Sequence, residues 1–159
     1  MKANQVLTWL KAHVSAQAHL RMDSRQVCLG DAFFACKGYA GDGRDYIGQA
    51  IAQGASVIVT EPLPKNVCAT SLSAPVLEVE SLKSMLGQIA HEWYGQVSAQ
   101  MSVIAITGTN GKTSTVHWVA QALNEAGVPC GTIGTLGVVL PNGTHLEGSL
   151  TTPDVLSMH

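Results

Sequence analysis

The residues best suited to chemistry form a glycine-spaced loop past the middle of the chain. Residues 107–114 read Thr-Gly-Thr-Asn-Gly-Lys-Thr-Ser. Gly108 and Gly111 let the backbone curl until successive N–H groups converge on an anion. Lys112 can then reach the β- and γ-phosphates of a nucleotide, and the Thr113 hydroxyl can bind Mg²⁺. The loop therefore predicts a binding site for a nucleoside triphosphate and magnesium.

Two elements must position this loop. Residues 103–106 are the apolar run Val-Ile-Ala-Ile, which predicts a strand entering the loop. Apolar residues then recur at helical spacing from Lys112 to Gly127, and a helix there would add unpaired N–H groups and the positive end of its dipole. Ile106 stands where a common phosphate loop has its first glycine. The alternative is a strand-to-helix turn whose glycines and threonines only cap a helix.

The chain after this helix looks incomplete for a phosphoryl-transfer site. Residues 128–135 predict the next parallel strand of a β-α-β crossover, and Asn142-Gly143 predicts a hairpin. Mg²⁺ also needs carboxylates, but Glu147 and Asp154 fall in loop or cap contexts. Two strands are fewer than a usual sheet contains. We therefore expect an amino-terminal fragment of a longer enzyme.

The residues before the loop alternate between helical and strand patterns, which indicates an α/β layered fold. We expect a small α/β domain over residues 1–97 and the start of a P-loop-type α/β domain over residues 98–159, because the stretch from 95 to 101 is polar and aperiodic. Helices are predicted at residues 6–14, 46–51 and 82–93, and strands at 30–36, 57–60 and 75–79. A further helix is predicted to open at the capping sequence of residues 151–154, Thr-Thr-Pro-Asp.

A second glycine-rich loop, residues 37–44, follows the first long apolar run. It holds three glycines, two basic side chains and Tyr39. Such a loop at the end of a strand can offer N–H groups and an aromatic face to a nucleotide. The alternative is an ordinary turn-rich connection.

Composition narrows the possible partners. The chain has 159 residues, of which 46% are hydrophobic and 13% charged, with a formal net charge of −2. This balance favours small-molecule partners over nucleic acid or a membrane surface. The four cysteines lie far apart without metal-ligand spacing, and no targeting or membrane-spanning segment is apparent. We expect a cytoplasmic protein with reduced cysteines and no structural zinc.

Taken together, the motifs resemble the Mur ligase family over almost the whole chain. The Thr-Gly-Thr-Asn-Gly-Lys-Thr loop is shared with other Mur ligases and, in a close variant, with folylpolyglutamate synthetases. The Asp-Ser-Arg and Thr-Thr-Pro motifs are most similar to the Mur ligases that add the third residue of the peptidoglycan stem peptide. The resemblance rests on residues 23–25, 30–34, 42–47, 107–113, 131–135 and 151–153.

The resemblance implies an ATP-dependent amide-bond ligase that acts through an acyl phosphate. Its partners are then UDP-MurNAc-L-Ala-D-Glu and a diamino acid, diaminopimelate or lysine, its cofactors ATP and Mg²⁺, and the parent protein is expected to be monomeric. Lys112 is the implied catalytic residue, and Thr113 the implied metal ligand. The implied ATP-binding residues are Gly108, Thr109, Asn110, Gly111, Lys112, Thr113 and Ser114. The implied residues for the UDP-linked substrate are Met22, Ser24, Tyr39, Ala40, Gly41, Thr151 and Thr152.

Two other functions stay open at this point. One is another ligase of the superfamily, of the MurF or folylpolyglutamate synthetase type. The other is a non-catalytic P-loop nucleotide-binding module; a GTPase-like switch should also carry an Asn-Lys-x-Asp motif, which this sequence lacks. We expect the chain to bind the UDP end of the substrate but not to catalyse ligation on its own.

Overall fold

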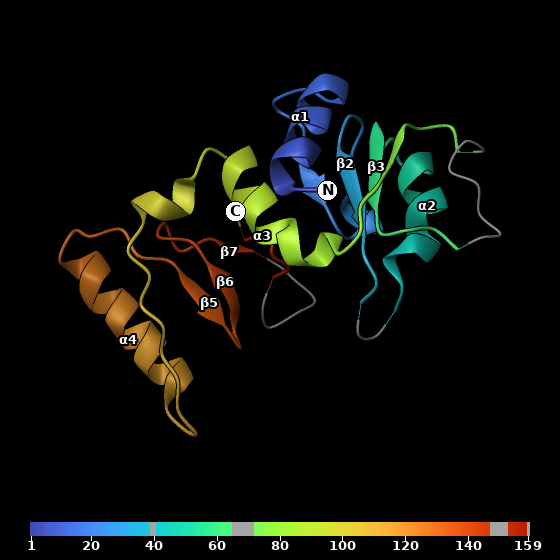
Figure 1. Ribbon diagram of the computed structural model, residues 1–159. Coiled ribbons are helices and arrows are strands. Elements are labelled where there is room, and N and C mark those ends of the chain that lie inside the picture. The colour runs from blue at the N-terminus through green and yellow to red at the C-terminus, as the bar shows by residue number, and fades with distance from the viewer. Residues whose placement is uncertain (39–40, 65–71, 147–152, 159) are drawn as a thin grey trace. The chain divides into compact units, whose positions relative to one another are not determined.

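The computed structural model describes residues 1–38, 41–64, 72–146 and 153–158 (Figure 1). It divides into two compact units. The first unit comprises Met1–Gln100 and the segment that begins at Asp154, and the second comprises Met101–Pro153. The sequence predicted a boundary after residue 97, whereas this division falls after Gln100 and returns the last segment to the first unit. The mixed α/β fold class is confirmed.

The first unit is built on a four-stranded parallel sheet. Its strands are β1 (Leu20–Arg21), β2 (Ala32–Ala35), β3 (Val57–Thr60) and β4 (Val76–Glu78), in the spatial order β1-β2-β3-β4. All residues of β2 and β3 are buried. Continuous apolar runs of this kind are expected of parallel strands covered on both faces. The three predicted strands are confirmed, and β1 was not predicted.

Helices cover both faces of this sheet (Figure 1). Side chains alternate along a strand, so Phe34 packs with α1 (Ala3–His13) and α3 (Leu82–Trp93), while Phe33 packs with α2 (Ile47–Ala52) on the opposite face. A 3-10 turn, η2 (Gly43–Tyr46), leads into α2. Gly54 follows that helix at φ +102°, which suits a glycine. The three predicted helices are confirmed.

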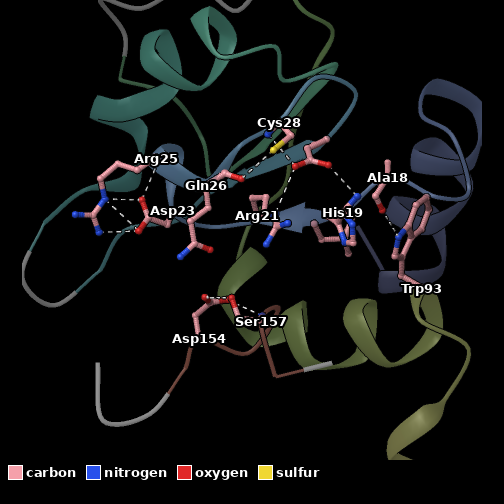
Figure 2. A network of polar contacts seen from close by, with 12 residues as sticks. Ala18, His19, Arg21, Asp23, Arg25, Gln26, Cys28, Trp93, Asp154 and Ser157 are labelled. Atoms are coloured by element: carbon pink, nitrogen blue, oxygen red, sulfur yellow. Dashed lines mark hydrogen bonds and ion pairs between the residues drawn. The ribbon is translucent and has the colours of Figure 1, made fainter. Parts of the chain in front are cut away.

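Long-range hydrogen bonds hold the short strand β1 in place. The Trp93 indole donates to the Ala18 carbonyl at 2.9 Å (Figure 2), and the Leu20 N–H donates to the Tyr94 hydroxyl at 3.0 Å. The carboxylate of Asp31, which is 3% exposed, accepts from the N–H groups of His19 and Cys28 at 3.0 Å. A two-residue strand carries no periodicity of its own, so sequence pattern does not reveal it.

The segment after Pro153 packs on the first unit. Leu156 is 2% exposed and belongs to the cluster formed by α1, α3 and the sheet. Asp154 caps this segment, since its carboxylate accepts from the N–H groups of Leu156 and Ser157 at 2.9 and 3.1 Å. Figure 2 shows Asp154 bonded to the Ser157 hydroxyl. The sequence predicted a helix here, but residues 155–158 form turns.

The second unit contains one helix and a small antiparallel sheet. The helix α4 (Lys112–Glu125) is predicted correctly, as is the hairpin at Asn142-Gly143, which joins β6 (Gly137–Val139) to β7 (His145–Leu146). β5 (Thr132–Gly134) pairs with β6 in antiparallel register. The prediction of a parallel strand over residues 128–135 is therefore wrong: a glycine at 137 with φ +86° turns the chain straight back.

The prediction of a strand over residues 103–106 is also wrong. This stretch has no strand assignment, and Val103 and Ile104 are 80% and 61% exposed. A strand exists only when a neighbour completes its hydrogen bonds. No described strand of the second unit pairs with residues 103–106, so an apolar, β-branched run is left unpaired.

Candidate functional site

Loops at the carboxyl edge of the parallel sheet carry the predicted substrate-binding residues Met22, Ser24 and Gly41. β1 is followed by Met22 and the 3-10 turn η1 (Ser24–Gln26), β2 by the glycine-rich loop, and β3 by Glu61. Ligands of open parallel sheets bind outside the carboxyl ends of the strands. The first unit therefore has a single edge at which these loops can form a site.

Ser24 is fixed to α2 by its side chain. Its hydroxyl donates to the Gln49 side-chain oxygen at 2.9 Å, and the residue is 5% exposed. With its proton committed to Gln49, this hydroxyl can only accept hydrogen bonds from a ligand. Met22 lies directly before this turn and is half-buried against the core. The structure thus brings Ser24 and Gln49 together, whereas Met22 packs with the cluster formed by α1, α3 and the sheet.

An ion pair between Arg44 and Asp42 braces the glycine-rich loop. The Arg44 guanidinium binds the Asp42 carboxylate through two nitrogens at 2.9 and 2.5 Å and donates to the Pro62 carbonyl at 2.6 Å. These hydrogen bonds from Arg44 hold the pKa of the Asp42 carboxyl below its ordinary value. Because Pro62 follows β3, this contact ties two loops of the edge together.

Glu61 and Glu78 serve the same loops as hydrogen-bond acceptors. The Glu61 carboxylate accepts from the Lys37 N–H at 3.0 Å, and the Glu78 carboxylate accepts from the Leu63 N–H at 3.0 Å. Gly41 is exposed, and its carbonyl accepts from the Gly38 N–H at 2.8 Å. Tyr39 and Ala40 lie outside the described residues, as do Thr151 and Thr152.

The phosphate loop lies in the second unit, at the start of α4. Gly108 and Gly111 have φ values of +151° and +77°, which glycine adopts without strain. The Lys112 ammonium folds back over the loop and donates to the Gly108 carbonyl at 2.6 Å and to the Thr109 carbonyl at 3.3 Å. Within the described residues, no acceptor is recorded for the backbone N–H groups of residues 108–111.

This arrangement fits a phosphate group. The loop offers an anion two kinds of positive charge. The N–H groups of residues 108–111 carry partial positive charges, and the ammonium of Lys112 carries a full one. The hydroxyl of Thr113 follows Lys112 on the first turn of α4, where it could bind Mg²⁺, and Thr109, Asn110 and Ser114 line the same exposed segment. Among the residues described here, no cluster of three His, Cys, Asp or Glu side chains could hold a metal ion.

A groove of about 250 Å³ lies elsewhere in the second unit, between α4 and the β5–β6 hairpin. Its walls include His117, Asn124 and Cys130 but no residue of the phosphate loop. The Asn124 amide and the Cys130 backbone, which both line this groove, exchange two hydrogen bonds of 2.9 Å. The groove is therefore separate from the predicted nucleotide site.

Sequence reasoning missed Gln49 and the role of the two arginines at the sheet edge. The signal that could have revealed them is a repeated pattern, Asp-X-Arg, at residues 23–25 and 42–44. In both copies the aspartate accepts from the arginine N–H and caps a 3-10 turn. Gln49 gives no comparable signal, because its partner Ser24 lies 25 residues away.

None of the helices in the described part of the chain combines the length and apolar character that a membrane span requires. Cys28, Cys36 and Cys130 are free thiols. Burial raises the pKa of the Cys36 thiol to about 12. Cys36 directly follows β2 and belongs to the core cluster.

Comparison with known proteins gives two family matches. A model described as "Mur ligase family, catalytic domain" matches residues 18–94, and one described as "Mur ligase middle domain" matches residues 106–159. Two curated relatives carry the name UDP-N-acetylmuramoyl-L-alanyl-D-glutamate--2,6-diaminopimelate ligase. The one from Pseudomonas putida KT2440 is 41% identical over 155 residues, and the one from Xanthomonas campestris pv. campestris strain 8004 is 46% identical over 141 residues.

The matches cover most of this chain but a minor part of the relatives. They span 96% and 88% of this chain, and 31% and 28% of the Pseudomonas and Xanthomonas proteins. Among solved structures, the MurF ligase of Thermotoga maritima in complex with ADP is 30% identical with a TM-score of 0.51, covering 69% of this chain and 24% of that one.

MurF from Acinetobacter baumannii is 28% identical with a TM-score of 0.56, over 78% of this chain and 27% of that chain. A solved 2,6-diaminopimelate ligase is 24% identical with a TM-score of 0.59, over 88% and 27%, and this similarity concerns the fold alone. Both family models, the named relatives and the fold agree with the motifs at residues 23–25 and 107–113. The chain belongs to the Mur ligase family.

Proposed function

We propose that this chain is part of an ATP-dependent ligase that adds the third amino acid to UDP-MurNAc-L-Ala-D-Glu in peptidoglycan synthesis. The observation that carries the proposal is that relatives of this printed name align with up to 96% of the chain. The geometry supports it, because the first unit presents a ligand edge and the second a phosphate loop. A cytoplasmic location and a monomeric parent protein stay predictions.

In the proposed reaction, the free carboxylate of the D-glutamate residue attacks the γ-phosphorus of ATP, and ADP leaves. The resulting acyl phosphate is attacked by the amine of the diamino acid, and inorganic phosphate leaves as the amide forms. The Lys112 ammonium offsets the negative charge that develops on the transferred phosphoryl group. Thr113 would hold Mg²⁺, and the ion would supply positive charge to the phosphates of ATP during the transfer.

The division of work between the two units follows from this proposal. Met22, Ser24 and residues 39–41 bind the uridine end at the sheet edge, residues 108–114 bind ATP, and Thr151 and Thr152 contact the muramoyl dipeptide. The chain spans about 31% and 28% of the relatives it matches. We therefore expect it to bind the uridine end without completing the ligation.

Calorimetric titration of the 159-residue chain with UDP, UDP-MurNAc-L-Ala-D-Glu and Mg-ATP tests the proposal. We expect saturable binding of both uridine ligands below 1 mM, on the order of ordinary substrate affinities. A Lys112→Ala variant should weaken ATP binding and leave UDP binding unchanged, since the two sites lie in different units. A chain that binds neither uridine ligand at millimolar concentration would contradict the proposal.

A MurF-type ligase is a second candidate, because two solved structures of that name are 28–30% identical to this chain. The two candidates differ in the peptide carried by the nucleotide. Titration with the UDP-muramoyl dipeptide and with the corresponding tripeptide separates them. Tighter binding of the dipeptide favours the first candidate, and tighter binding of the tripeptide favours the second.

A further inference from the structure

Two turns at the carboxyl edge of the sheet have the same local structure. Asp23 and Asp42 each cap a 3-10 turn, and each accepts from the N–H of the arginine two residues later at 3.0 Å. Each arginine also binds its aspartate through both Nε and Nη2. The local sequence therefore prescribes two equivalent ion pairs.

The surroundings of the two arginines, Arg25 and Arg44, differ. The Arg44 side chain is 19% exposed, and its remaining nitrogen, Nη1, donates to the Pro62 carbonyl. The Arg25 side chain is 70% exposed, and within the described residues its Nη1 has no recorded acceptor. Figure 2 shows the contacts between Arg25 and Asp23. All three side-chain nitrogens of Arg44 thus have partners in the fold, whereas the Nη1 of Arg25 has no recorded partner among the described residues.

Arg25 also lies beside the loop that leads to α2. It is within electrostatic reach of Tyr46, the last residue of η2, and α2 contacts both 3-10 turns. An exposed ion pair between near neighbours contributes little to stability. What Asp23 does accomplish is to hold the guanidinium plane in one orientation, so that little freedom remains to be lost when a further anion binds.

We infer that Arg25 binds the diphosphate of the uridine nucleotide, an inference that rests on the proposed function. Its free Nη1 and the outer N–H of Nη2 can donate to phosphate oxygens in the forked geometry that guanidinium offers. The adjacent Ser24, held by Gln49, faces the nucleoside end of the same ligand. Neighbouring residues of one turn thus contact the base side and the phosphate side of UDP.

The test compares UDP with uridine, which lacks the phosphates, on the 159-residue chain. In the Arg25→Gln variant we expect the Kd for UDP to rise about tenfold, the loss of a charge-assisted hydrogen-bonded pair, and the Kd for uridine to change less than twofold. Arg25→Lys keeps the positive charge but loses the forked donor geometry of the guanidinium. Its Kd for UDP should lie between the values for Arg25→Gln and the unmodified chain. The unmodified chain should also lose UDP affinity with added salt more steeply than Arg25→Gln.

Lys11→Gln is the matched control, because it removes one positive charge from α1 and should leave both Kd values unchanged. Thermal unfolding of each variant confirms that the fold is kept. Equal weakening of UDP and uridine in Arg25→Gln would overturn the inference in favour of a structural role, and no weakening of either would also overturn it. If the unmodified chain binds neither ligand, the proposed function itself fails.

Discussion

The two units treat their apolar residues in opposite ways. In the first, Phe33, Phe34 and Ile58 are fully buried between the sheet and its helices. In the second, Ile104, Trp118 and Leu136 are 61%, 70% and 61% exposed. This second unit also contains the phosphate loop. A motif that can be recognised in seven residues thus forms part of a unit whose apolar side chains have little to pack against. A segment can therefore carry a recognisable phosphate-binding motif although the described residues of the unit around it form no well-packed hydrophobic core.

The largest difference should appear in backbone hydrogen exchange. The amides of β3 are bonded within a buried sheet, whereas residues 103–106 pair with no described strand. We expect exchange at least ~10³-fold slower in β3, since its amides exchange only when the first unit opens. Exchange followed by mass spectrometry measures this ratio. Comparable protection in both segments would mean that residues 103–106 have found a partner strand.

Matched truncations of isoleucine should give the next largest effect. Ile58→Ala removes a side chain that is 0% exposed and should lower the free energy of unfolding by about 2–5 kcal/mol. Ile104→Ala removes one that is 61% exposed and should change it by less than about 0.5 kcal/mol. Urea unfolding followed by circular dichroism measures both values. A costly Ile104→Ala would show that the second unit buries more than its structure indicates.

Alkaline pH should weaken the first unit through Cys36. An unfolded thiol ionises near pH 9, but burial raises the pKa of Cys36 to about 12 in the fold. Between these values the unfolded chain releases a proton that the folded chain keeps, so stability falls as pH rises. We expect the urea midpoint to decline from pH 9 to 12, and Cys36→Ala to decline less. Parallel curves for the two proteins would contradict this assignment.

The smallest effect should come from the connection between α4 and Cys130 in the second unit. Asn124→Ala removes both hydrogen bonds between α4 and Cys130, which lie at an exposed site. We expect a loss of about 1 kcal/mol in local stability, seen as roughly fivefold faster exchange of the Cys130 amide. Gln121→Ala, which removes only a bond to Glu125, is the control and should leave that amide unchanged.

Sequence pattern predicted the first unit well because its elements are long enough to carry a period. The helix over residues 82–93 and the strand over 57–60 are where the spacing of apolar residues placed them. β1 escaped prediction because two residues have no period, and Tyr94 and Trp93 hold it from far along the chain. Residues 103–106 have the composition of a strand, but a strand also needs an adjacent strand to complete its hydrogen bonds, and composition does not reveal whether one is present.

The candidate site shows the same limit. The phosphate loop was predicted from its residue types and Ser24 from the family resemblance, but the contrast between Arg25 and Arg44 could not be predicted from the sequence. Their local sequences are alike, and the difference arises from the carbonyl of Pro62, 18 residues beyond Arg44. Long-range partners decide which of two similar side chains is left available to a ligand.

The lengths of the strands have a further consequence for self-association. The outer strands of the four-stranded sheet, β1 and β4, have only two and three residues, and the N–H of Leu20 is already bonded to Tyr94. Such short edges offer little template to a second molecule. Residues 103–106 are the opposite case, a largely exposed apolar run whose backbone groups have no recorded hydrogen-bond partner in the described part of the chain. If this chain forms aggregates when concentrated, that run is where we expect them to nucleate.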